Sequence, residues 1–217
     1  MGTFTTEYSD YGVGRKGAFD RNRITSDVTV ITEPTAEPVT LSEVKAAMGV
    51  SHDDDDQMIA GYIKSARRWA ESYLNAYIMT QVVEVTMDAF PGWEFGLGLW
   101  PLQSIDSVKY DDTSSPITEQ TLTVNTNYYA DTTAQCGRIK LIDDIPDVTS
   151  RPNAVKIRCT VGYADTGASP VDARDGVPEE IKTGLKMYVK GLYESDPCAK
   201  VAAREIIHHR QVKCGGL

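Results

Sequence analysis

The sequence lacks a long hydrophobic run. No stretch approaches the roughly 20 apolar residues that a membrane-spanning helix needs, so we expect no contact with a membrane. The first 21 residues, MGTFTTEYSDYGVGRKGAFDR, contain no apolar segment like that of a secretion signal, so a signal peptide is not predicted. These absences predict a soluble protein that is made in the cytoplasm.

Histidine and cysteine are scarce, and familiar catalytic motifs are missing. The three histidines are His52, His208 and His209, and the four cysteines include no CxxC pair. The patterns GxSxG and HExxH and a phosphate-binding loop do not occur. His208, His209 and Cys214 offer three zinc ligands, but their spacing matches no familiar site and a fourth ligand is lacking. We therefore predict no enzyme activity, no cofactor and no metal site.

Positive charge is in the minority. Lysine and arginine number 22 against 31 aspartates and glutamates, which gives a formal net charge of −9. A protein that grips DNA needs Lys and Arg to displace counterions from the phosphates. The composition therefore disfavours DNA binding, although an acidic wall would let DNA pass without sticking to it.

The clearest element is a long helix. Apolar side chains recur every three or four residues between Ile59 and Tyr77, which predicts a helix over about residues 54–77. The aromatic residues on this face, expected in the core or at a subunit interface, are Tyr62, Trp69 and Tyr73. The opposite side carries Lys64, Arg67, Arg68 and Glu71. Before this helix, Thr40 and Glu43 have the spacing of a capping box, which predicts a short helix that Gly49 ends.

A β-rich segment follows at about residues 80–165. Apolar and polar residues alternate from Gln81 onward, as in a half-buried strand, and further short strand candidates lie between turn signals. The aromatic stretch Phe90–Trp100 lacks interleaved Lys and Arg, so we expect it to pack in the core or at an interface and not to stack on bases. The helical period returns over about residues 178–195, where Leu185 and Tyr188 are expected in the core or at an interface. The predicted fold class is α+β.

The two ends differ from the middle. Residues 1–38 are rich in Thr, Gly, Tyr and charge, and we expect an extended arm that makes contacts through aromatic residues, with one short strand at Val28–Ile31. The aromatic residues of the arm are Phe4, Tyr8, Tyr11 and Phe19. Residues 196–217 form a basic tail, which leaves residues 39–195 as the main domain.

Four consecutive aspartates, Asp53–Asp56, precede the long helix. In a calcium loop counted from Asp53, the sixth position would be Met58 and the twelfth Lys64, where an EF-hand needs Gly and Glu. A carboxylate at a helix N-terminus accepts the unpaired N–H groups of the first turn. We therefore predict that Asp53 and Asp54 cap the helix.

These pieces, in this order, resemble the head–tail connector proteins of tailed bacteriophages, also called adaptors or head-completion proteins. The resemblance covers roughly residues 28–195. It rests above all on PVTLSEVK leading into the acidic stretch and the long helix, with PLQSIDSVKY downstream. The resemblance implies a helical bundle with a β-rich insertion between its main helices.

The resemblance also implies a function and partners. Such proteins form a non-enzymatic ring, usually of twelve subunits, beneath the portal in the neck of the virion. The ring extends the DNA channel and presents a surface to the tail or to tail-completion (stopper or terminator) proteins. Family members tend to end in an apolar and basic segment that docks on the portal. Here that place is taken by EIIHHRQ, which departs from the usual pattern, and the portal-docking residues that it implies are Arg204, Ile206, Ile207, His208, His209 and Arg210.

Two alternatives stay open. The chain is alternatively a tail-completion or neck protein that binds the tail tube. A more remote alternative, from a different class, is a metal-dependent hydrolase that uses Asp53–Asp56.

Overall fold

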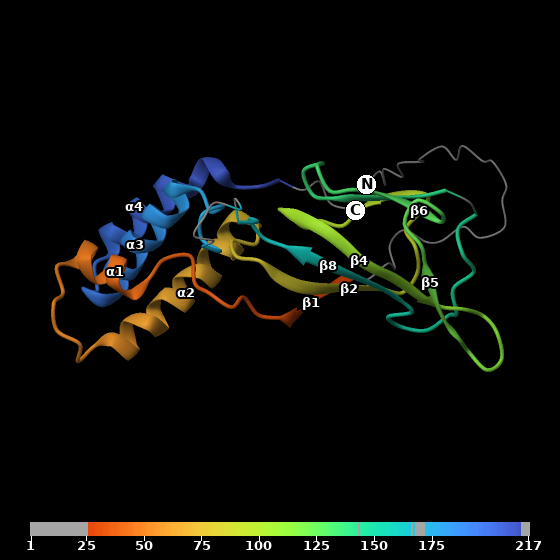
Figure 1. The fold of residues 1–217 in the computed structure, drawn as a ribbon, viewed down its shortest axis with the longest axis horizontal. Coiled ribbons are helices and arrows are strands. Elements are labelled where there is room, and N and C mark those ends of the chain that lie inside the picture. The colour runs from red at the N-terminus through yellow and green to blue at the C-terminus, as the bar shows by residue number, and fades with distance from the viewer. Residues whose placement is uncertain (1–25, 143, 166, 168–171, 214–217) are drawn as a thin grey trace, which may run out of the picture.

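The computed structural model describes residues 26–142, 144–165, 167 and 172–213. These residues form an α+β fold with four α-helices, one 3-10 helix and eight β-strands, all paired antiparallel within two sheets. The helices gather at one end of an elongated molecule and the strands at the other (Figure 1). The predicted α+β class is therefore confirmed.

The helices fall close to the predicted ranges. The helix predicted over about 54–77 is observed at Asp56–Leu74 (α2), and the helix predicted over about 178–195 is observed at Glu179–Tyr193 (α3). Asn75 adopts a left-handed conformation (φ 52°) directly after α2, as is common at helix ends. The remaining helices are α1 (Leu41–Met48), α4 (Pro197–Ile207) and η1 (His208–Arg210).

The predicted capping box of α1 is present. The Glu43 N–H donates to the Thr40 hydroxyl (3.2 Å), and the Thr40 N–H donates to the Glu43 carboxylate (2.7 Å). Each bond satisfies a backbone donor that lacks an intrahelical partner. Gly49 ends the helix with φ 73°, a conformation that costs glycine little.

The larger sheet has the strand order β1-β2-β8-β4-β5. Its strands are β1 (Ser26–Thr32), β2 (Gln81–Met87), β4 (Leu102–Asp111), β5 (Glu119–Leu122) and β8 (Val155–Val161). Buried and partly exposed residues alternate along β2 and β8, so one face of this sheet is in the core and the other is polar. The strand predicted at Val28–Ile31 is confirmed as part of β1. The sheet thus includes residues 26–32, which the sequence assigned to an arm outside the core.

A smaller sheet has the order β3-β7-β6. Its strands are β3 (Glu94–Gly96), β6 (Tyr128–Asp131) and β7 (Arg138–Leu141). The inner faces of the two sheets share one hydrophobic core. Phe90 and Phe95 are buried there with ring centroids 6.2 Å apart, which confirms the packing role predicted for this stretch.

A second hydrophobic core lies among the helices, and its buried members come from all four helices or their flanks. The two cores meet where α2 gives way to β2, because Ile78 and Met79 belong to the helical core and Val83 belongs to the sheet core. The helical core contains Val39, Val44, Ile59, Ile63, Ala66, Ala70, Leu74, Ala76, Ile78, Met79, Val177, Ile181, Leu185, Val189, Ile207 and Val212.

Candidate interaction surfaces

An aromatic stack lies on the helical half of the molecule. The rings of Trp69 and Tyr188 are parallel to within 9° with centroids 3.9 Å apart, and Tyr73 continues the stack with its centroid 5.9 Å from that of Trp69. These rings and Tyr62 are partly exposed and pack against the helical core, whereas Leu185 is fully buried within it. Trp69, Tyr73 and Tyr188 thus form one stack between α2 and α3.

Tyr73 connects this stack to the C-terminal segment. Its hydroxyl lies 2.6 Å from Nδ1 of His208, within hydrogen-bond distance. The Arg204 guanidinium lies over its ring, 5.2 Å from the centroid, in a cation–π contact. α4 and η1 are therefore held against α2 by polar as well as apolar contacts.

The C-terminal segment is folded onto the helical core. Ile207 is fully buried, and a Cβ at Gly184 of α3 would lie only 2.5 Å from the Ile207 side chain, so α3 and α4 approach closely because this position is glycine. The Val212 N–H donates to the Leu74 carbonyl (2.9 Å), which ties the chain after η1 to the end of α2.

The predicted docking residues therefore divide into two groups. The apolar pair is inside: Ile207 is buried and Ile206 is partly buried, so Ile207 does not offer the exposed apolar anchor that the sequence suggested. The polar residues of the same segment remain exposed on the surface of α4 and η1: Arg204, His208, His209 and Arg210. Arg210 also pairs with Glu180 at 3.2 Å.

The acidic turn before α2 has a different role from the predicted one. The N-cap residue is Asp55, and its side chain makes no capping hydrogen bond. The prediction that Asp53 and Asp54 cap the helix is wrong. Lys45 on α1 instead binds the carboxylates of Asp53 (2.6 Å) and Asp56 (2.7 Å), which joins the two helices. Tertiary pairing thus replaces the local cap, and the bond from Lys45 lowers the pKa of Asp53.

The other two acidic side chains of this turn point to different surroundings. Asp55 accepts a hydrogen bond from the Tyr193 hydroxyl (2.7 Å), and Asp54 is 95% exposed. Within the described part of the chain, no group of three or more His, Cys, Asp and Glu side chains is placed to hold a metal ion.

A buried arginine joins the segment before α1 to α2. Arg67 is 2% exposed, and its guanidinium donates to Glu37 (2.8 Å), Glu71 (3.1 Å) and Glu33 (3.4 Å). Burial by itself would lower the pKa of Arg67. The bond to Glu37 and the charges of the surrounding carboxylates outweigh this effect, so the pKa of Arg67 is raised. This network links segments that are thirty or more residues apart in the sequence.

Glu71 extends the network toward the sheet. Its carboxylate also accepts bonds from the Ile78 N–H and the Gln81 side chain, both at 3.1 Å. Burial nevertheless raises the pKa of Glu71. The sequence placed Arg67 and Glu71 on the polar side of the helix. The one feature of the sequence that could have indicated the pairing of Arg67 is the acidic pair Glu33 and Glu37 in the segment before α1.

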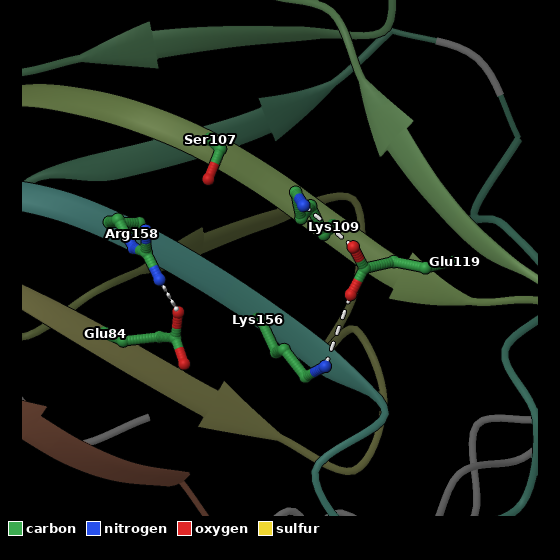
Figure 2. A pocket seen from close by; sticks show the side chains of 6 residues that line it. All are labelled: Glu84, Ser107, Lys109, Glu119, Lys156 and Arg158. Atoms are coloured by element: carbon green, nitrogen blue, oxygen red, sulfur yellow. Dashed lines mark hydrogen bonds and ion pairs between the residues drawn. The ribbon is translucent and has the colours of Figure 1, made fainter.

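The polar face of the larger sheet carries a charged hollow of about 240 Å³. Figure 2 shows that the charges come from four neighbouring strands and point toward one another. Glu119 binds Lys109 at 2.7 Å and Lys156 at 3.3 Å, and Glu84 binds Arg158 at 3.0 Å. The lining residues are Glu84, Ser107, Lys109, Glu119, Lys156 and Arg158. Each charged side chain of this set has an opposite partner, as is typical of a solvated surface.

Two further expectations from the sequence are contacts made by the N-terminal arm and the lack of a membrane-spanning helix. The arm residues Phe4, Tyr8, Tyr11 and Phe19 lie outside the described residues. Among the residues that the structure describes, every helix is too short or too polar to span a bilayer.

One part of the chain matches a family model in sequence. Residues 38–92 match the model of the family described as phage gp6-like head-tail connector protein. The match spans α1, α2, β2 and the acidic turn between the helices. It confirms the resemblance that the sequence motifs indicated. No curated protein matches this chain in sequence.

Solved structures with the same fold extend the likeness to most of the chain. A chain in the neck of an empty GTA particle, computed with C6 symmetry, has a TM-score of 0.68 at 14% identity over 88% of this chain and 98% of that chain. A chain in the virion of a native gene transfer agent (GTA) particle has a TM-score of 0.65 at 15% identity over 87% and 98%. A chain in the neck of a native GTA particle, computed with C12 symmetry, has a TM-score of 0.60 at 14% identity over 86% and 98%. At these identities the likeness establishes a shared fold.

Proposed function

We propose that this chain is a structural head–tail adaptor of a tailed phage or a phage-like particle, located in the neck of the virion. The observation that carries this proposal is the agreement of two independent likenesses. Residues 38–92 match a head-tail connector family in sequence, and 88% of the chain follows the fold of a protein in a GTA particle neck. No bond is made or broken in this role, and the protein acts through its contacts.

The proposed assembly is a ring of twelve copies beneath the portal, through which DNA passes. Necks computed with C6 and C12 symmetry contain chains of this fold, which supports a closed ring. A ring requires one heterologous contact repeated by rotation. The net charge of −9 suits a channel wall that does not bind DNA phosphates.

The proposed partners are the portal on one side and the tail or a tail-completion protein on the other. The exposed basic group of the C-terminal segment is a candidate portal contact, with charge setting the register of docking. Its members are Arg204, His208, His209 and Arg210. Within this proposal, the helical half is a bundle, and the segment that forms β2 to β8 is inserted between α2 and α3.

Negative-stain imaging and mass photometry of the purified protein, alone and with portal particles, test the proposal. We expect rings of one fixed mass that attach to the portal. A protein that stays monomeric with both portal and tails would contradict the adaptor role. Rings that bind tail tubes but not portals would instead favour the tail-completion alternative.

A further inference from the structure

The two edges of the larger sheet differ in a way that indicates an unfilled pairing site. β1 is an edge strand, and none of the described strands pairs with its outer side. It exposes three large apolar side chains, Val28 (40%), Val30 (41%) and Ile31 (46%). A long edge strand with exposed apolar residues is a template for pairing with another chain.

The regularly paired part of this free edge is well defined. The pairing register with β2 shifts between Val30 and Thr32, so Ile31 is an extra residue and regular pairing runs from Ser26 to Val30. Val28 and Val30 pair with Val85 and Val83 of β2, which are buried. Val28 and Val30 therefore extend the apolar face of the sheet to its edge, where none of the described strands covers them.

The opposite edge is protected. β5 has four residues, and its Glu119 is held by two lysines. Pro116, which has no backbone N–H, lies three residues before the strand. Short strands, charges and proline at an edge oppose strand addition. An extension of the sheet is thus favoured on the β1 side.

We propose that the free edge of β1 accepts a strand from the N-terminal segment, residues 1–25, of the neighbouring copy in the ring. This inference rests on the proposed ring and names the contact that joins its subunits. Pairing of β1 with β1 of a second copy would be isologous and would close at two copies, so a ring needs a different segment as donor.

The sequence of residues 1–25 is suited to form the added strand. In an extended strand, Phe4, Thr6 and Tyr8 of TFTTEY lie on one face, where the two aromatic rings would cover Val28 and Val30 of the acceptor. The segment ends at Thr25, directly before β1 begins at Ser26, and 25 extended residues reach about 80 Å, which is ample for a neighbouring copy.

The same segment is poorly suited to fold back on its own β1. Residues 20–25, DRNRIT, contain none of the Asn-Gly, Asp-Gly or Gly-Gly pairs that favour a tight hairpin. The nearest glycines, in residues 12–17, would turn the chain so that Phe4 and Tyr8 lie beside residues 18–25, before β1 begins. Donation between copies is therefore favoured.

Photo-cross-linking tests the donor and the acceptor directly. Full-length protein with p-benzoylphenylalanine in place of Phe4 is mixed with an equal amount of ¹⁵N-labelled protein, assembled on portal particles and irradiated. We expect the main linked peptide to contain β1, and about half of these links to join the two isotopes, as random mixing requires for donation between copies. Links to β1 confined to one isotope, or links to other surfaces, would overturn the proposal.

Charge substitutions give a second readout. Val28→Lys with Val30→Lys should lower the ring population at least about tenfold, because charges on this edge oppose strand pairing. Ile117→Lys is the matched control, since Ile117 is 48% exposed near the protected edge, and it should leave the rings intact. Circular dichroism checks that each variant folds.

The outcomes separate this inference from the adaptor role. Normal rings in the Val28/Val30 variant would overturn the inference and leave the adaptor role standing. Wild-type protein that forms no ring with portal particles would overturn both.

Discussion

The buried guanidinium of Arg67 donates a 2.8 Å hydrogen bond to the carboxylate of Glu37, thirty residues earlier in the chain. This pair fixes the segment before α1 against the side of α2. Because β1 directly precedes that segment, the same contact positions the edge strand relative to the helices.

We predict that Arg67→Met lowers the free energy of unfolding by about 3–5 kcal/mol, because it removes a buried guanidinium that pairs with the largely buried carboxylate of Glu71 and the partly buried one of Glu37. Urea denaturation followed by tryptophan fluorescence measures the change. Arg68→Met is the control: Arg68 is 59% exposed and pairs with Glu33, so its loss should cost less than about 1 kcal/mol. Equal effects of the two substitutions would contradict the structural role of Arg67.

The aromatic stack gives a second prediction. Trp69→Ala should lower the free energy of unfolding by about 2–4 kcal/mol, because it removes a partly buried ring stacked at 3.9 Å on Tyr188. Trp69→Phe keeps an aromatic ring and should cost clearly less. Thermal unfolding measures both, and a Trp69→Ala variant as stable as wild type would show that the stack does not support the fold.

A third prediction separates folding from docking in the C-terminal segment. Ile207→Ala should destabilise the protein by about 2–4 kcal/mol, because Ile207 is fully buried. Val201→Ala on the same helix, where Val201 is 60% exposed, should change stability by less than about 0.5 kcal/mol. For the same reason, deletion of residues 199–217 should destabilise the fold itself.

Portal docking needs substitutions that spare this core. Arg204→Glu with His209→Glu should leave the protein folded, because both side chains are exposed and the Arg204–Tyr73 contact, a cation–π contact at an exposed site, contributes little to stability. The variant should weaken co-sedimentation with portal particles. Wild-type binding by this variant would exclude the basic surface of α4 and η1 as the portal contact.

The fourth prediction concerns acid. The bond from Arg138 (2.7 Å), together with bonds from Thr133 and Ala134, lowers the pKa of Asp131 to about 2. Because the folded pKa lies below the unfolded value of about 3.9, this stabilisation is complete above about pH 4 and is lost as the pH falls toward 2. Asp131→Asn should therefore lower the melting temperature at pH 7 and make it less dependent on pH between 4 and 2. A variant with the wild-type pH profile would contradict this assignment.

The fifth prediction concerns the four aspartates. Asp54→Ala should have little effect on stability, because Asp54 is 95% exposed and does not cap α2. Calorimetry should detect no tight binding of calcium or magnesium to the wild-type protein. Tight binding that is lost in a variant with all four aspartates replaced, together with a hydrolytic activity, would revive the hydrolase alternative.

The sequence by itself determined the local elements. The repeat of apolar residues placed α2 and α3 to within a few residues, Thr40 and Glu43 formed the predicted capping box, and the change to a period of two marked β2. These features depend on side chains a few positions apart, so their physical causes are contained in short stretches of sequence.

The tertiary structure alone decided which distant groups meet. Lys45 pairs with Asp53, which was expected to cap α2, and Arg67 pairs with three carboxylates. Ile207 lies in the helical core because Gly184 lets α4 pack closely against α3. β1 likewise belongs to the sheet through its pairing with β2, at least fifty residues later in the chain. The sequence around a charged or apolar residue looks the same whether its side chain faces solvent or a distant partner. Its burial and its pairing therefore depend on the packing of segments that are remote in the sequence.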